Sequence, residues 1–298
     1  MQKRNICVIL NAGSGRKNVK SQPETLNAAF AAHGAEITIK VIKKGSALTT
    51  ETQKAVDEGF ETIVAAGGDG TIAEVAAGLA GSFATLGLLP LGTANVLAWE
   101  LGIPLRPTGA AAVLAEGRTA LLHPGLARFA DGTTRLFVQM LGAGFDAAVV
   151  AGLDLGLKRR LGRSAYVWQS LRELPRYAFP PIEAVLDGVA TRTSSVIVTK
   201  GRLYAGRYLV APGADPTAPG FHVVLFDRAG PAFAALAGAA LPLGLIPRLP
   251  GVRLLRAVHI ALRAEAAVPV QADGDPAGRL PVSIEPAAQP LRIRLPLG

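Results

Sequence analysis

The stretch ETIVAAGGDGTIAEVAAGL, from Glu61 to Leu79, decides the fold of the first half of the chain. An apolar run typical of a buried strand ends at Ala66, and a helical pattern begins at Thr71. Between them stand three glycines around one acid, Asp69. Glycine lets the backbone turn its N–H groups toward a ligand, and a helix N-terminus attracts anions. The stretch therefore predicts a strand, a phosphate-binding loop and a helix.

Two further junctions of the same kind lie in the first 124 residues, LNAGSGRK (Leu10–Lys17) and PLGTAN (Pro90–Asn95). Each combines glycine with Ser, Thr or Asn between a strand-like run and a predicted helix. The alternation of strands and helices predicts a parallel sheet with helices on both faces. Ligands of such sheets bind at the carboxyl ends of the strands, so we expect a phosphate-bearing ligand at this edge.

Asp69 is the one carboxylate in these loops, and phosphate repels a carboxylate unless a cation lies between them. Mg²⁺ favours one or two carboxylates together with phosphate oxygens. Asp69 thus indicates either a magnesium nucleotide or a base that faces a substrate hydroxyl. The structural alternative is an Asx-turn cap on the helix that begins at Thr71. No P-loop pattern occurs in the chain.

The second half changes character after LLHPGLARFADGTTRLFVQMLG (Leu121–Gly142). Short strand-like runs follow, separated by Gly, Pro and Asp-Gly turns, and we expect a β-sandwich or a barrel. Two helical stretches interrupt the strands, Ser164–Ala178 and the region from Ala232 to Pro247. The second of these is interpreted more readily as a buried helix than as a lipid-facing element. The final LRIRLPLG alternates as a strand and could pair in either half.

Composition limits the partners and the compartment. The chain of 298 residues carries a net charge of +9, and half of its residues are hydrophobic. A basic protein favours anionic membranes, phosphorylated ligands or nucleic acid, but no dense basic block with interleaved aromatics is present, so we expect no nucleic acid partner. Cys7 is the only cysteine, which fits a reducing compartment, and we expect a cytoplasmic protein without a signal peptide or membrane span.

GGDGT, with NAGSG upstream and PLGTANVLAWELGIP downstream, resembles the catalytic domain of the diacylglycerol kinase family, which includes bacterial lipid kinases and sphingosine kinases. The likeness continues through GAGFDA, KRRLGRSAYV and QADGD and covers nearly the whole chain. It implies two domains, an α/β nucleotide-binding domain at 1–124 and a β-sandwich lipid-substrate domain at 125–286. The last strand, 287–298, would return to the first domain, and the active site would lie in the cleft.

The resemblance also implies the site residues. Asp275 and Asp69 are the candidate catalytic acids, Asp146 would lie near the lipid hydroxyl, and Asp69 with Asp215 would bind metal. The implied contacts to ATP are Asn11, Ser14, Gly15, Gly67, Gly68, Asp69, Gly70, Thr71, Gly92, Thr93, Asn95, Arg159, Arg160 and Asp273.

Two departures from the family pattern bear on these roles. The late motif usually ends in glutamate, and here it is Asp275, which is one methylene shorter. The segment Pro212–Phe221 resembles one that carries a structural Mg²⁺, but Pro219 replaces the acid before its last glycine. Asp215 remains, but Pro219 supplies no carboxylate, which counts against a structural metal here.

The function that the resemblance implies is an ATP- and Mg²⁺-dependent lipid kinase, with diacylglycerol as the leading acceptor. It would associate peripherally with an anionic membrane surface, as the basic charge also suggests. The oligomeric state stays open, a homodimer included. Two alternatives remain, a soluble small-molecule kinase related to NAD kinases and a non-catalytic nucleotide-binding regulator.

Overall fold

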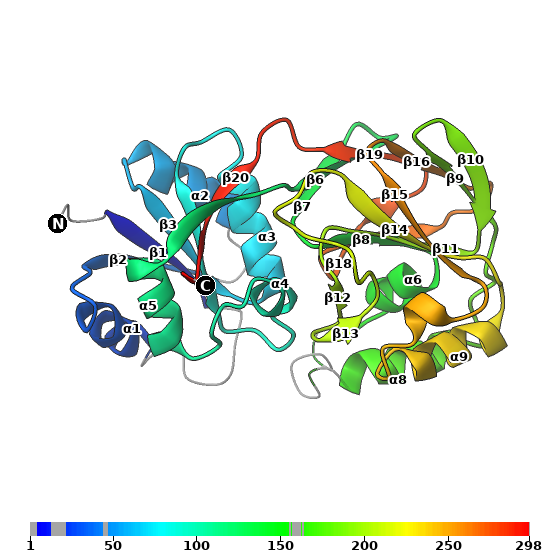
Figure 1. Ribbon diagram of the computed structural model, residues 1–298, viewed down its shortest axis with the longest axis horizontal. Coiled ribbons are helices and arrows are strands. Elements are labelled where there is room, and N and C mark those ends of the chain that lie inside the picture. The colour runs from blue at the N-terminus through cyan, green and yellow to red at the C-terminus, as the bar shows by residue number, and fades with distance from the viewer. Residues whose placement is uncertain are drawn as a thin grey trace. The chain divides into compact units, whose positions relative to one another are not determined.

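The computed structural model describes residues 5–12, 22–43, 47–154, 156, 162 and 164–297 (Figure 1). Contacts within the chain divide it into two units. Unit 1 comprises residues 1–122 and 288–298, and unit 2 comprises residues 123–287. The chain thus leaves unit 1 once, builds unit 2, and comes back.

Unit 1 is a six-stranded sheet with helices on both faces, in the strand order β2-β1-β3-β4-β20-β5. The neighbouring strands from β2 to β20 are parallel, and β5 is antiparallel to β20. Helix α1 packs beside α5, and α2 packs beside α3 on the other face (Figure 1). The strands are β1 (Ile6–Asn11), β2 (Ile37–Ile42), β3 (Thr62–Gly67), β4 (Thr85–Pro90), β5 (Arg118–Leu122) and β20 (Leu291–Leu295). The helices are α1 (Gln22–Ala31), α2 (Leu48–Asp57), α3 (Asp69–Gly78), α4 (Val96–Glu100) and α5 (Pro107–Glu116).

The central strands of unit 1 are buried on both faces, as parallel strands covered by helices must be. All six residues of β3 are buried, and so are the first five of β1. Cys7 belongs to this core, and burial raises the pKa of its thiol to about 11. The thiol is therefore neutral and unreactive at physiological pH.

Unit 2 is a β-sandwich of two six-stranded sheets, with strand orders β10-β9-β16-β19-β6-β7 and β15-β14-β11-β8-β17-β18. Its strands are antiparallel throughout the described pairs. The first sheet consists of β6 (Gly125–Phe129), β7 (Thr134–Phe137), β9 (Ile182–Leu186), β10 (Val189–Thr193), β16 (Ile260–Arg263) and β19 (Val282–Pro286). The second consists of β8 (Met140–Ala143), β11 (Ser195–Thr199), β14 (Phe221–Phe226), β15 (Val252–Ala257), β17 (Pro269–Ala272) and β18 (Asp275–Arg279).

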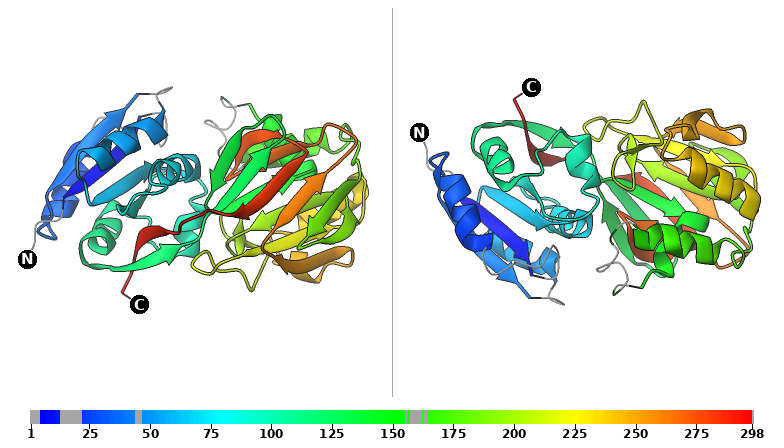
Figure 2. Two further views of the ribbon diagram at one scale, coloured as in Figure 1. Left: turned by 90° about the horizontal axis from the view of Figure 1, so that it is seen from above. Right: turned by 90° about the horizontal axis from the view of Figure 1, so that it is seen from below.

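One apolar core fills the space between these sheets. It takes side chains from both, among them Phe129, Ile182 and Leu262 from the first and Val198 and Val223 from the second. A small hairpin and further helical segments also belong to the unit (Figure 2); those that the structure describes are β12 (Leu203–Tyr204), β13 (Tyr208–Leu209), α6 (Phe145–Ala151), α8 (Ser164–Glu173), α9 (Pro231–Ala240) and the 3-10 turn η2 (Ile246–Arg248). The expected two-part fold, a parallel α/β unit and a β-sandwich, is confirmed.

The structure corrects two local predictions. The run TRTSSVIVTK, Thr191–Lys200, is one of the short strand-like runs of the second half, but it breaks at Ser194, so β10 and β11 lie in different sheets. The Ser194 hydroxyl donates to the carbonyls of Phe226 and Arg228, and these bonds fix the corner.

The stretch from Ala232 to Pro247 is not a buried helix. Only Phe233 and Ala240 of α9 are buried, and several leucines of the stretch are exposed. In the part of the chain that the structure describes, each helix is too short or too polar to cross a membrane.

Candidate active site

The three glycine junctions of unit 1 follow neighbouring strands. They come directly after β1, β3 and β4, which are adjacent and parallel in the sheet. The carboxyl ends of parallel strands meet at one edge of a sheet, where ligands of α/β folds bind. Of the expected nucleotide contacts, Ser14 and Gly15 in the first junction and Arg159 and Arg160 in unit 2 lie outside the described residues.

The second and third junctions touch each other through their glycines. A side chain on Gly92 would collide with the Cα of Gly68, and one on Gly67 would collide with the side chain of Thr71. The Leu91 N–H donates to the Gly67 carbonyl over 2.8 Å. Only glycine fits at these two positions, because any side chain there would push the two loops apart or displace Thr71.

Side-chain amides hold the loops in shape. The Asn11 amide donates to the Thr71 hydroxyl over 3.0 Å, which connects the first junction to the second. Asn95 adopts a left-handed backbone with φ of 50°, and its side chain binds both the N–H and the carbonyl of Gly92, at 2.9 and 3.0 Å. Asparagine is among the few residues that tolerate this conformation.

Asp69 does not cap its own helix. The N-cap residue of α3 is Gly68. The Asp69 carboxylate instead accepts the N–H of Val96, 2.7 Å away, at the start of α4. Burial raises the pKa of Asp69, while hydrogen bonds from the amides of Val96, Leu97 and Asn95 act in the opposite direction. The Asx-turn alternative is therefore wrong, and the carboxylate fastens the second junction to the helix that follows the third.

In unit 2 the late acidic motif is a tight hairpin between β17 and β18. Ala272 pairs with Asp275, so the turn consists of Asp273 and Gly274, with φ of 50° and 84°. Positive φ at both positions is the type I′ turn that Asp-Gly favours. The Asp273 carboxylate accepts three amide N–H groups at 2.8–2.9 Å, from Val138, Gln139 and Met140. Asp273 thus anchors the turn to the chain entering β8, and its role as a nucleotide contact stays a prediction.

Gln271 links this turn to Asp146, and sequence reasoning did not single it out. Its side-chain oxygen accepts the Gly274 N–H at 2.9 Å, and its amide donates to Asp146 Oδ2 at 3.2 Å. Gln271 is 2% exposed. Asp146 lies in the first turn of α6, and burial raises the pKa of its carboxyl to about 6.

Two buried polar atoms at Asp146 and Tyr177 have no hydrogen-bond partner among the described residues. They are Asp146 Oδ1 and the Tyr177 hydroxyl oxygen. The Phe145 ring packs against Tyr177 and Phe179, with centroids 5.9 and 5.4 Å apart. A buried polar atom without a partner is costly, so such atoms call for a ligand or water. This arrangement can receive a hydroxyl group beside an apolar wall.

The segment around Asp215 does not fit the structural metal that the resemblance implied. Asp215 Oδ1 accepts both the N–H and the hydroxyl of Thr217, at 2.8 and 2.7 Å. The carbonyl of Pro216 accepts the His123 N–H, and those of Ala218 and Gly220 accept the Lys200 ammonium. Within the described ranges, no group of three or more His, Cys, Asp or Glu side chains could hold a metal ion.

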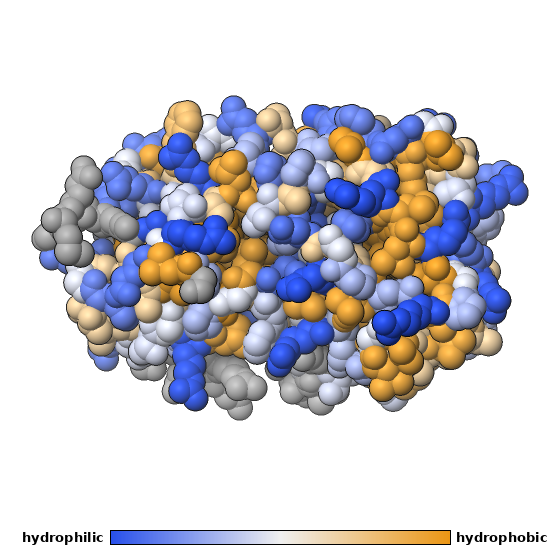
Figure 3. Space-filling view, in the orientation of Figure 1, coloured by the Kyte–Doolittle hydropathy of each residue, from blue (hydrophilic) through white to orange (hydrophobic). Residues whose placement is uncertain are grey.

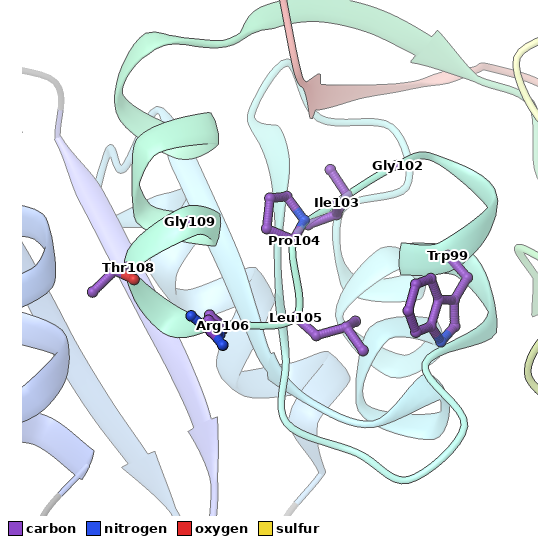
Figure 4. Close-up of a pocket in the computed structure, with 8 residues that line it drawn as sticks. All are labelled: Trp99, Gly102, Ile103, Pro104, Leu105, Arg106, Thr108 and Gly109. Carbon is purple, nitrogen blue, oxygen red and sulfur yellow. The ribbon is translucent and has the colours of Figure 1, made fainter.

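A cavity of about 430 Å³ lies elsewhere in unit 1, between α4 and the start of α5 (Figure 4). Trp99 lines one end, and Arg106 and Thr108 line the other. None of the site residues predicted from the sequence lines it.

Comparisons with known proteins cover both units. The family model described as "Diacylglycerol kinase catalytic domain" matches residues 5–127. The one described as "YegS C-terminal NAD kinase beta sandwich-like domain" matches residues 139–295.

Individual relatives agree with these matches. Over 161 residues the chain is 37% identical to a "Probable lipid kinase YegS-like" of Xanthomonas campestris pv. campestris (strain 8004), covering 52% of this chain and 51% of that protein. The chain thus spans about half the length of the first curated relatives it matches. Over 293 residues it is 31% identical to a protein of the same description from Pseudomonas aeruginosa (strain UCBPP-PA14), covering 92% and 91%.

A solved structure shares the fold. The chain superimposes on a crystal structure of a diacylglycerol kinase from Bacillus anthracis str. Sterne with a TM-score of 0.73 and 18% identity. The match covers 99% of this chain and 98% of that one.

Proposed function

The chain belongs to the YegS-like family of lipid kinases, and from this premise we propose that it transfers the γ-phosphate of ATP to the hydroxyl of a lipid, with diacylglycerol as the leading acceptor. The observation that supports the proposal is the close approach of two glycine loops, after β3 and β4, next to the strand β1 that leads into a third glycine junction. Backbone N–H groups at helix N-termini are suited to phosphate oxygens.

Phosphoryl transfer depends mainly on positioning and on charge stabilisation. The proposal assigns the phosphates of ATP to Gly67, Gly68, Gly70 and Thr71 and to the loop from Gly92 to Asn95. Asn11 supports Thr71 from the neighbouring strand end. A Mg²⁺ ion would come with ATP and would neutralise charge on its phosphates. Asp69 is the carboxylate of these loops that would face the ion, directly or through water.

A base must accept the proton of the lipid hydroxyl as the oxygen attacks the γ-phosphorus and ADP leaves. We favour Asp275 for this role over Asp69. The Asp69 carboxylate already accepts the Val96 N–H at 2.7 Å, so it is engaged in fastening α4 to the second junction. Asp275 stands directly after the Asp-Gly turn, whose shape Gln271 and Asp273 fix.

Asp146 would orient the acceptor rather than take its proton. Its open Oδ1 and the Tyr177 hydroxyl offer hydrogen bonds to a polar head group, and the ring of Phe145 lies beside them. In this scheme a polar head sits next to an apolar wall, which suits a lipid and fits a fully polar acceptor poorly.

The deciding experiment measures ATP turnover and labelled product with the purified full chain and radiolabelled ATP. The acceptors are dispersed diacylglycerol, phosphatidylglycerol, a sphingoid base and ceramide, with NAD as the soluble alternative. We expect magnesium-dependent labelling of a lipid, strongest with diacylglycerol. Labelling of NAD alone would replace the proposal by the NAD-kinase alternative, and ATP binding without turnover on any acceptor would favour a regulator.

A further inference from the structure

Helix α8 turns large apolar side chains to solvent. Val167, Trp168 and Leu171 are 62%, 58% and 59% exposed. Their spacing puts all three on one face of the helix, whereas Ala165 and Gln169 on the other face are buried. An ordinary amphipathic surface helix has the opposite arrangement, with polar residues outward.

Helix α9 and the turn after it do the same. Leu236, Leu243 and Leu245 are exposed, and α9 contains no charged residue. Figure 1 and the view from below in Figure 2 both show α8 and α9 on the same side of unit 2. Figure 3 shows apolar side chains along the lower part of unit 2, where α8 and α9 lie in Figure 1. We call the exposed side chains of Val167, Trp168, Leu171, Leu236, Leu243 and Leu245 the apolar face.

Positive charge flanks the apolar face. Arg172 and Arg176 are exposed at the end of α8, and Arg228 and Arg248 are exposed before and after α9. The acid next to Arg228, Asp227, is already paired with Arg253 at 2.6 Å. Apolar side chains with arginines around them match the two layers of an anionic bilayer, an acyl interior and a charged head-group plane.

We propose that the apolar face of α8 and α9 is the surface by which the protein docks on an anionic lipid bilayer. The inference rests on the proposed lipid kinase activity, because the acceptor of that reaction resides in a membrane. Tryptophan is enriched at membrane interfaces, where its ring is buried and its N–H stays near the head groups, and Trp168 provides this anchor.

The test measures co-sedimentation with vesicles of phosphatidylcholine, with and without phosphatidylglycerol, at low and high salt. The double variant Trp168→Ala/Leu171→Ser should bind anionic vesicles about tenfold more weakly or worse, because half-exposed apolar side chains lose their burial in the bilayer. The matched control is Phe83→Ser, since Phe83 is 83% exposed but lies in unit 1. In a Trp99→Phe background, the emission of Trp168 should shift to the blue on binding.

Unchanged vesicle binding by the double variant would overturn the proposal. So would gel filtration in which the double variant turns a dimer into a monomer with vesicle binding unaltered, since a second copy would then cover the face. Short-chain diacylglycerol in solution separates this inference from the proposed function. The double variant should phosphorylate this soluble lipid at the wild-type rate. A wild-type protein that phosphorylates none of the lipids would refute the proposed function, but the vesicle-binding result would still test the docking surface.

A second observation concerns Lys200, which is 2% exposed although it carries a charge. Its ammonium donates to the carbonyls of Ala218 and Gly220 and lies 5.2 Å from the centre of the Phe221 ring. These carbonyls belong to the segment for which the resemblance implied a structural Mg²⁺. We infer that Lys200 is the resident cation of this segment and that its loop needs no divalent metal.

Hydrogen exchange of peptides spanning 212–221 tests this second inference. Protection in the wild type should be equal in Mg²⁺ and in EDTA, and Lys200→Met should lower it at least tenfold, whereas Lys54→Met on exposed α2 should not. Loss of protection in EDTA would overturn the inference. Should Lys200→Met fail to fold, the chelator comparison on the wild type still decides.

Discussion

The replacement Asp69→Asn separates chemistry from structure at the nucleotide loops. The side chain keeps its shape, but the amide cannot reproduce the charged acceptor that now faces the Val96 N–H at 2.7 Å. A hydrogen bond to a charged group is worth about 1.5–3 kcal/mol and one between neutral groups about 1 kcal/mol. The same replacement removes a buried charge, and because burial raises the pKa of Asp69, the relief from desolvation outweighs the weaker hydrogen bond at neutral pH. The melting temperature at neutral pH should therefore be no lower than that of the wild type.

The variant should therefore be folded at 25 °C, where domains are stable by about 5–15 kcal/mol. If Asp69 also binds the metal ion or accepts the proton of the lipid hydroxyl, kcat with dispersed lipid should fall by a factor of about 10² or more. Thermal unfolding, kinase turnover and binding of a non-hydrolysable ATP analogue are measured on the same preparation. Asp57→Asn, on the exposed end of α2, is the control.

Two results would refute the reasoning. A folded Asp69→Asn protein that keeps more than about a tenth of the wild-type kcat has no need of the carboxylate in the reaction. A variant that loses ATP binding together with activity, with α4 open to hydrogen exchange, shows that Asp69 acts only by fastening the two loops.

Further outcomes are expected elsewhere in the chain. Asp275→Asn should remove most lipid phosphorylation with little change in ATP affinity, while Asp275→Glu should keep measurable activity. A nearly active Asp275→Asn variant would indicate that Asp69, not Asp275, accepts the proton. Gln271→Leu should lower kcat at least tenfold with KM for ATP unchanged, because the turn before Asp275 loses its hydrogen bond from Gly274 to Gln271. An unchanged kcat would show that Gln271 does not position Asp275. Burial raises the pKa of Asp146 from 3.8 to about 6, so wild-type stability should fall as the pH rises from about 4 to 6. Asp146→Asn should then be more stable by up to about 3 kcal/mol at pH 8 and show no gain near pH 4, as thermal unfolding across pH would reveal. Binding to anionic vesicles should weaken as salt rises, because exposed charges are screened beyond about 8–10 Å, and salt-independent binding would exclude charge as the docking force.

The parallel unit could be predicted because its signals are local. The apolar runs before the three glycine junctions form β1, β3 and β4, as at Gly67, whereas the strand order departs from chain order, with β1 between β2 and β3 and β20 between β4 and β5. Helix α5 was not predicted from the sequence, because its alanine-rich segment, PTGAAAVLAE, has no clear polar face and so no periodic pattern. The break at Ser194 was not predicted either, because the hydrogen bonds that fix it are made with residues more than thirty positions away in the chain.

The candidate site could be predicted only as a set of residues. That Asp69 binds the start of α4, 27 residues away, and that Asp273 binds amides more than 130 residues away depend on the fold rather than on local pattern. Lys200 shows the same limit, since a single lysine at the end of a strand is ordinarily solvated. Motif positions indicate which residues matter, and the fold shows which of them shape the loops.

The position of β20 has a consequence for how the protein is made. This strand lies between β4 and β5, yet residues 123–287 are synthesised before it leaves the ribosome. Until then the edge of β4 is unpaired and β5 has no neighbour in its sheet, and an open edge is a template for aggregation. Unit 1 therefore completes its sheet after translation of unit 2, and a fragment that stops at residue 122 would lack an interior strand of its own sheet.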